Sequence, residues 1–112
     1  MAYSNTTADI TKGTAIINTE ILTGTVTIDN QFDSAYIYSN AGAITATLGA
    51  GLYIGQVKTI VMTDATASST VSITNHQTSD PEVATFDAVD ETGVFMWTGT
   101  EWITIFATCT FL

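Results

Sequence analysis

The chain has 112 residues, of which 46% are hydrophobic and only 12% are charged, and its formal net charge is −9. This length allows one domain, which can bury a modest core without a disulfide or a metal ion. The only basic residues, Lys12 and Lys58, cannot form the basic clusters that bind phosphates, so neither nucleic acid nor an anionic membrane surface is an expected partner.

The sequence predicts one all-β domain behind a short N-terminal arm. Residues 1–13 are small and polar, and we interpret them as the arm. From residue 14 to residue 112, Thr, Val and Ile dominate and turn signals recur at short intervals. We therefore expect a single compact antiparallel sandwich or jelly-roll-like domain over residues 14–112.

In the first half of the chain, short strands are expected between polar turns. The predicted strands are 14–18, 24–28, 35–39 and 43–48. Asn40, Ala41 and Gly42 are typical of a hairpin turn, which would place the third and fourth of these strands side by side. After a glycine-rich break comes the longest strand-like run, residues 53–62.

The second half ends in the clearest hairpin. Strands are predicted at 70–74 and 83–86, and then at 93–97 and 102–106, which flank a turn at 98–101. Alternation puts Phe95 and Trp97 on one face of the strand and Val94 and Met96 on the other. Because both faces are apolar, we expect both to be covered, one of them by a neighbouring subunit.

These features give a set of candidate interface residues and an expected homotrimer. The candidates are Val94, Phe95, Met96, Trp97, Trp102 and Lys58. The two tryptophans are expected to anchor either the core or the subunit interface. Lys58 has two interpretations, a surface lysine with a snorkelling stem or one partner of an ion pair with an acid.

Candidate chemistry is sparse, and each group has a structural interpretation that we favour. His76, the one histidine, lies in a polar loop, where a solvated side chain is more common than a catalytic one. Asp87, Asp90 and Glu91 could bind a hard cation, but their spacing fits a solvated acidic turn. Cys109 is expected to be buried as a small hydrophobe. We therefore predict no catalytic residue, no cofactor, no metal and no enzymatic activity.

Four aromatic residues offer a different kind of site. Tyr36, Tyr38, Trp97 and Trp102 could form a platform on which a sugar stacks, although aromatic residues on strands more often belong to a core or an interface.

Four segments of the second half carry a resemblance to a known class of proteins. They are 55–60 (GQVKTI), 71–74 (VSIT), 85–89 (TFDAV) and 94–103 (VFMWTGTEWI). This pattern resembles small structural proteins of tailed bacteriophages, namely head decoration (cement) proteins and fibre modules. It spans roughly half of the chain, from about residue 52 to residue 105.

The resemblance implies an all-β trimer that binds the major capsid protein and stabilises the head, without catalytic residues. It implies a location on the capsid exterior, and in the host cytoplasm during assembly. The alternative is a fibre or spike module that binds a host glycan. Because the module fills almost the whole chain and no shaft-like repeat accompanies it, we expect a decoration protein, whose arm extends the contact with the capsid.

Overall fold

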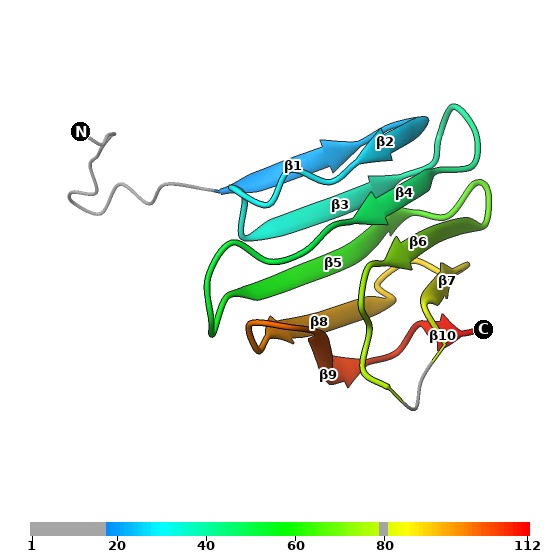
Figure 1. Ribbon diagram of the computed structural model, residues 1–112. Helices are drawn as coiled ribbons and strands as arrows, with labels where there is room; N and C mark the ends of the chain where they lie inside the picture. Colours follow the sequence, from blue (N-terminus) through cyan, green and yellow to red (C-terminus); the bar gives the residue numbers. More distant parts are fainter. Residues whose placement is uncertain (1–17, 79–80) are drawn as a thin grey trace, which may run out of the picture.

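The computed structural model describes residues 18–78 and 81–112. The predicted arm at 1–13, and all but the last residue of the predicted strand at 14–18, lie outside the described residues. The described part contains ten strands and no helix, so it offers no helix that could cross a membrane. The strands form two facing layers (Figure 1).

Each layer is a five-stranded sheet. The first has the order β1 (Thr19–Leu22), β3 (Ser34–Tyr38), β5 (Val57–Asp64), β8 (Thr92–Trp97), β9 (Trp102–Ala107). The second has the order β10 (Thr110–Phe111), β7 (Val83–Phe86), β6 (Ser69–Ile73), β4 (Thr45–Leu48), β2 (Thr25–Thr27). We call them the β5 sheet and the β6 sheet after their central strands. The prediction of a compact all-β sandwich is confirmed.

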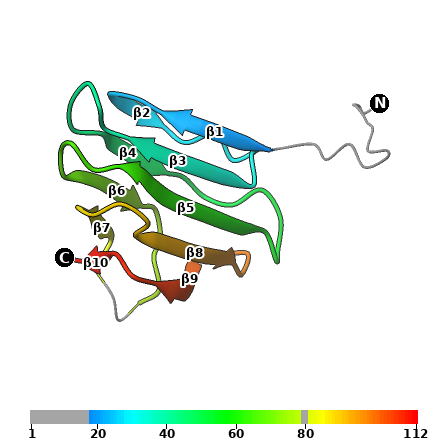
Figure 2. The same ribbon diagram turned by 180° about the vertical axis from the view of Figure 1, so that it is seen from behind.

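The pairing of the strands is mixed, whereas the sequence predicted antiparallel pairing throughout. Strands β1 to β6 alternate between the sheets, so the chain winds through three coils (Figure 2), and neighbouring strands of successive coils run parallel. Only the pairs that involve β7 to β10 are antiparallel. The expected hairpin at Asn40 to Gly42 is instead a corner that carries the chain from one sheet to the other.

The core lies between the sheets and follows from the alternation of side chains along the strands. On β5, Ile60 and Met62 point inward and are fully buried, and β4 and β6 contribute alternate residues in the same way. Burial of each such side chain stabilises the fold by about 1.5–3 kcal/mol. The largest fully buried apolar side chains in this core are Trp102, Phe86, Phe95, Leu22, Ile37, Leu48, Ile60, Met62 and Ile73.

The last hairpin is confirmed, and its outer edge is covered at Trp102, the first residue of β9. Trp97 pairs with Trp102, and the Thr98 amide donates to the Glu101 carbonyl at 2.9 Å. On the free side of β9, the Trp102 amide donates to the Asn75 carbonyl at 2.8 Å, and its carbonyl accepts from the Gln77 amide at 2.9 Å. This backbone contact protects an edge that would otherwise be open to pairing with another chain.

Candidate functional site

The six candidate interface residues fall into two groups. Phe95, Trp97, Trp102 and Lys58 are buried within the subunit, so as interface residues they were predicted wrongly. The physical reason is that alternation points them between the sheets, where the two indole rings pack with centroids 5.3 Å apart. Val94 and Met96 lie on the outer face of the β5 sheet and remain partly exposed. For the tryptophans, the core alternative is the correct one.

Lys58 is a fully buried lysine, so the prediction of a snorkelling surface residue is wrong. Its ammonium donates to the Asp29 carbonyl at 3.0 Å and to the Phe32 carbonyl at 2.6 Å. Burial lowers the pKa of Lys58, and the negative charges of Glu20, Asp29 and Asp33 partly offset this effect. The side chain thus ties the turn between β2 and β3 to the central strand of the β5 sheet.

Two more polar side chains at this end shape the loop between β4 and β5. Buried Gln56 donates to the Asn30 carbonyl at 2.7 Å and accepts from the Leu52 amide at 2.7 Å. The Asn30 amide group donates to the carbonyls of Gly49, at 3.2 Å, and Ala50, at 2.8 Å. The loop is therefore held from several sides, and sequence reasoning missed this polar network.

The same loop exposes a short apolar tip. The exposed fractions of Leu52, Tyr53 and Ile54 are 59%, 59% and 76%. A methyl group added at Gly99, in the β8–β9 turn, would lie 3.0 Å from Ile54, which shows that the tip rests on that turn. The tip therefore projects from the sandwich with Ile54 close to the β8–β9 turn.

His76 is buried, so the prediction of a solvated loop histidine is wrong. Its Nδ1 lies 2.7 Å from the Pro81 carbonyl oxygen, and its Nε2 lies 2.7 Å from the Thr104 hydroxyl. The ring stacks on Phe111 at a centroid distance of 4.9 Å and meets the edge of Phe95 at 6.0 Å. Since both nitrogens are engaged and the ring is packed between aromatic neighbours, His76 ties its loop to β9 and β10.

The acidic turn and the cysteine occupy structural positions as well. The Glu91 carboxylate accepts from the backbone amides of Asp87, at 2.7 Å, and Ala88, at 3.4 Å. Residues 18–78 and 81–112 contain no group of three or more side chains placed to hold a metal ion. Cys109 is buried in the core, as predicted, and burial raises the pKa of its thiol to about 11.

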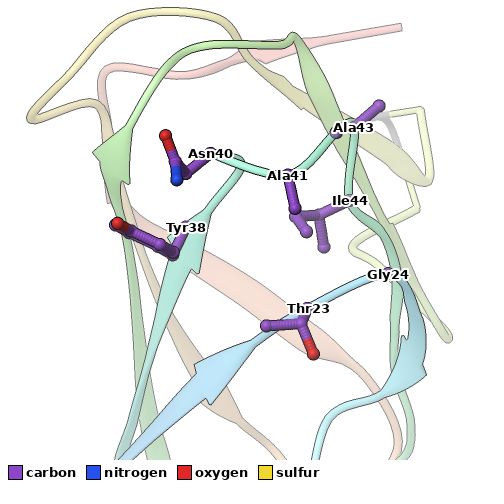
Figure 3. Close-up of a pocket in the computed structure, with 8 residues that line it drawn as sticks. Thr23, Gly24, Tyr38, Asn40, Ala41, Ala43 and Ile44 are labelled. Atoms are coloured by element: carbon purple, nitrogen blue, oxygen red, sulfur yellow. The ribbon is translucent and has the colours of Figure 1, made fainter.

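A small cavity of about 230 Å³ opens at the end of the sandwich where the chain turns between the sheets. It lies between the β1–β2 corner and the β3–β4 corner, with Tyr38 and Thr23 on its walls (Figure 3). Its other lining residues are Gly24, Asn40, Ala41, Gly42, Ala43 and Ile44. No charged side chain lines it, and its size is below the roughly 300–1,000 Å³ usual for ligand pockets.

The broad outer surfaces of the two sheets are the largest features of the described part. The outward apolar side chains of the β5 sheet form what we call the apolar face, made of Ile21, Tyr36, Tyr38, Val57, Val61, Val94, Met96, Ile103 and Phe106. The outer surface of the β6 sheet carries a row of threonines, one per strand, made of Thr25, Thr45, Thr70, Thr85 and Thr110. Within the strand pairings of the described residues, the one charged residue in register with an outward position is Asp64, which pairs with Tyr38 at the end of β5.

Comparison with known proteins gives no family. No protein-family model and no curated protein matches the sequence. The interpretation of the site therefore rests on its geometry.

The acidic residues of the described part lie around the rim of the sandwich. They are in loops and turns, apart from Glu20 in the edge strand β1 and Asp64 at the end of β5. The Glu20 carboxylate accepts from the Asp29 amide at 2.9 Å, and the Asp64 carboxylate accepts from the Thr66 amide at 2.9 Å. Hydrogen bonds from the Thr66 side chain and backbone lower the pKa of Asp64. The described part thus has an acidic rim and two sheet surfaces whose middle carries no charged side chain.

Proposed function

We propose that this protein is a non-enzymatic structural component of a tailed-phage particle, which binds the outer capsid surface as a homotrimeric decoration protein. The observation that carries the proposal is the distribution of charge. The middle of both broad sheet surfaces carries no charged side chain, while the carboxylates, including Asp64 at the end of β5, gather at the rim. Surfaces of this kind suit contacts with other proteins, since the centres of protein interfaces are depleted of charged residues.

The groups that could support catalysis have structural roles in the described part. The ring nitrogens of His76 hold a loop, the Lys58 ammonium holds a turn, and the Cys109 thiol is buried. These structural roles therefore favour a protein that acts by binding other proteins over a protein that acts as a catalyst.

The sequence resemblance supports the same proposal. Its four segments fall on β5, β6, β7 with its following turn, and the β8–β9 hairpin, so they cover the centre of both sheets. A trimer that touches several capsid subunits at once gains avidity, because each later contact forms at a high effective concentration.

The test is binding to phage particles that lack this protein. Purified protein is mixed with such particles, and bound copies are counted on a stained gel and located by cryo-electron microscopy. We expect hundreds of copies at repeated capsid positions and increased survival of the particles on heating. Failure of the full-length protein to bind would refute the decoration role.

A glycan-binding fibre or spike module is the second candidate. Tyr36 and Tyr38 are 37% and 45% exposed, and Tyr38 borders the cavity. However, Trp97 and Trp102 are buried, which removes half of the predicted aromatic platform. Binding to host surface polysaccharide, lost in Tyr38→Ala but not in Thr47→Ala on the opposite sheet, would favour this candidate over decoration.

A further inference from the structure

The strand register aligns the residues of the apolar face into rows across the β5 sheet. Ile21 pairs with Tyr36, and Tyr36 pairs with Val61. In another row, Val57 pairs with Met96, which pairs with Ile103. Paired residues point to the same side of a sheet, so these side chains form one continuous surface.

This surface exposes several large apolar side chains on neighbouring strands. The exposed fractions are 56% for Ile21, 43% for Val57 and 55% for Phe106. The polar residues in the same rows are threonines and serines, such as Thr19, Ser34, Thr59 and Thr92, except for Asp64, which pairs with Tyr38 at the end of β5. Contiguous apolar surface of this kind marks a contact site in soluble proteins.

The charge of the molecule indicates what covers the apolar face. The net charge is −9, and the only lysine in the described part is buried under the β2–β3 turn. Two copies that approach through their rims bring carboxylates together, with no exposed cation from the described residues to compensate them. Two copies that approach through the apolar face bring in only Asp64, at the end of β5, so this is a surface on which like-charged copies can meet. The outer surface of the β6 sheet also lacks charge, but its row is made of threonines and offers little apolar area.

The size of the face sets the strength of such a contact. Five strands spaced about 4.8 Å apart, each about 20 Å long, give a flat area of about 400–500 Å² per copy. In a trimer each copy divides this area between two neighbours, so three copies bury about 1,200–1,500 Å² in total, and each single contact buries less than the roughly 1,000 Å² of a stable pairwise interface. The trimer therefore depends on closing all three contacts together.

We infer that the apolar face is the self-association surface of this protein and that its occupant is a second copy of the same chain. This inference rests on the proposed homotrimer and assigns its contact. A threefold arrangement needs two different patches on each copy. The face provides them, with Tyr36 and Ile21 on its β1–β3 side and Met96 and Phe106 on its β8–β9 side.

The inference is tested with charged substitutions on the two outer surfaces of the full-length protein. Val61→Lys places a lysine on the central strand of the apolar face, and Tyr36→Lys places one at a more exposed position. Thr70→Lys is the matched control, because it lies on the central strand of the β6 sheet with a similar, intermediate exposure. Circular dichroism and thermal melting establish that each variant is folded.

Light scattering and sedimentation over a micromolar concentration series then give the mass. We expect about three chains for the wild type and for Thr70→Lys. For Val61→Lys and Tyr36→Lys we expect an association constant lower by roughly a hundredfold or more, because an unpaired charge buried in an interface is costly. Added salt should strengthen wild-type association, since it screens repulsion between acidic rims.

Several results would overturn the inference. These are a wild type that stays monomeric over the series, folded face variants that associate normally, or a Thr70→Lys variant that dissociates as much as they do. Capsid binding is measured separately on undecorated particles. Association through the face without capsid binding would refute the decoration role alone, and capsid binding by a monomer would refute the self-association surface alone.

Discussion

The buried lysine allows a sharp test of how the two sheets are held together at one end. Lys58→Met keeps the length and the apolar stem of the side chain and removes the ammonium group. The carbonyl oxygens of Asp29 and Phe32 then lose the donor that lies 3.0 Å and 2.6 Å away. The variant therefore measures the connection between the β2–β3 turn and the centre of the β5 sheet.

The magnitude follows from two opposing terms. A hydrogen bond to a charged group contributes about 1.5–3 kcal/mol, and an acceptor left unpaired in a buried position costs about 1–3 kcal/mol. Against this, the variant no longer carries the desolvation cost of a buried ammonium, which is several kcal/mol before compensation. Two bonds are lost and one desolvation cost is relieved, so we expect a net loss of about 2 kcal/mol in the free energy of unfolding.

The pH dependence has a definite sign. Burial lowers the pKa of Lys58 below its ordinary value of 10.5. Between the lowered pKa and 10.5, the unfolded chain binds more protons than the folded chain, so the contribution of this group to the free energy of unfolding rises with pH. The stability difference between the wild type and Lys58→Met should therefore widen as the pH is raised through this window.

The assay is chemical and thermal unfolding at several pH values. A loss of about 2 kcal/mol lowers the melting temperature by roughly 8–16 °C in a domain of this size. Thr47→Met, on the exposed outer surface of the β6 sheet, is the control and should change stability by less than about 0.5 kcal/mol. A Lys58→Met variant as stable as the wild type, or a difference that narrows with rising pH, would refute this account of Lys58.

Three other predictions concern the core. Gly51→Ala should cost about 1–3 kcal/mol, because its new methyl group would lie 2.3 Å from Trp97, whereas Gly49→Ala meets no atom within 4 Å and should be tolerated in the same melting assay. Trp102→Ala should cost about 3–5 kcal/mol and give mostly insoluble protein, and an unchanged melting temperature would show that the indole is not a core residue. The wild type should lose roughly 2–3 kcal/mol of stability between pH 9 and pH 11, because the folded Cys109 thiol has a pKa of about 11 instead of 9.0. Cys109→Ala should not show this loss, and identical pH profiles for the two proteins would contradict the prediction.

The strands whose partners are close in the sequence could be predicted from the sequence. The β8–β9 hairpin follows from alternation around a short turn, and the alternation of β6 is visible in the same way. The parallel coils could not be predicted, because their spacing varies. Thr19 pairs with Ser34, 15 positions away, whereas Thr45 pairs with Thr70, 25 positions away. Because the spacing between paired parallel strands varies, the sequence of a corner between the two sheets cannot be distinguished from that of a hairpin turn.

The buried polar residues His76 and Lys58 were predicted wrongly for different reasons. His76 is flanked by polar residues, and its burial depends on Thr104 and Phe111, which are far away in the sequence. Lys58, in contrast, shares its parity with Ile60 and Met62 on one strand, so alternation already indicated an inward side chain. The preference of lysine for the surface was given more weight than the strand pattern.

Four of the interface candidates, Phe95, Trp97, Trp102 and Lys58, failed for a related reason. Val94 to Trp97 is apolar on both faces, which predicts that both faces are covered. The sequence does not say which face the other sheet of the same subunit covers. The structure assigns Phe95 and Trp97 to that side and leaves Val94 and Met96 on the outside, next to Val57 and other apolar residues of neighbouring strands.

The division between uncharged faces and an acidic rim connects the fold with the proposed function. In the parallel strands of successive coils, each outward residue is in register with an outward residue of the neighbouring strand. A threonine at the same position of each strand therefore forms a row across the sheet. Loops have no such register, and they carry most of the carboxylates. Repulsion between rims disfavours contacts of two copies through their loops and edges, which is a form of specificity by exclusion. Restricting contacts to the sheet surfaces limits the orientations in which subunits can meet, and a defined orientation is what many weak contacts on a repeated capsid surface require in order to act together.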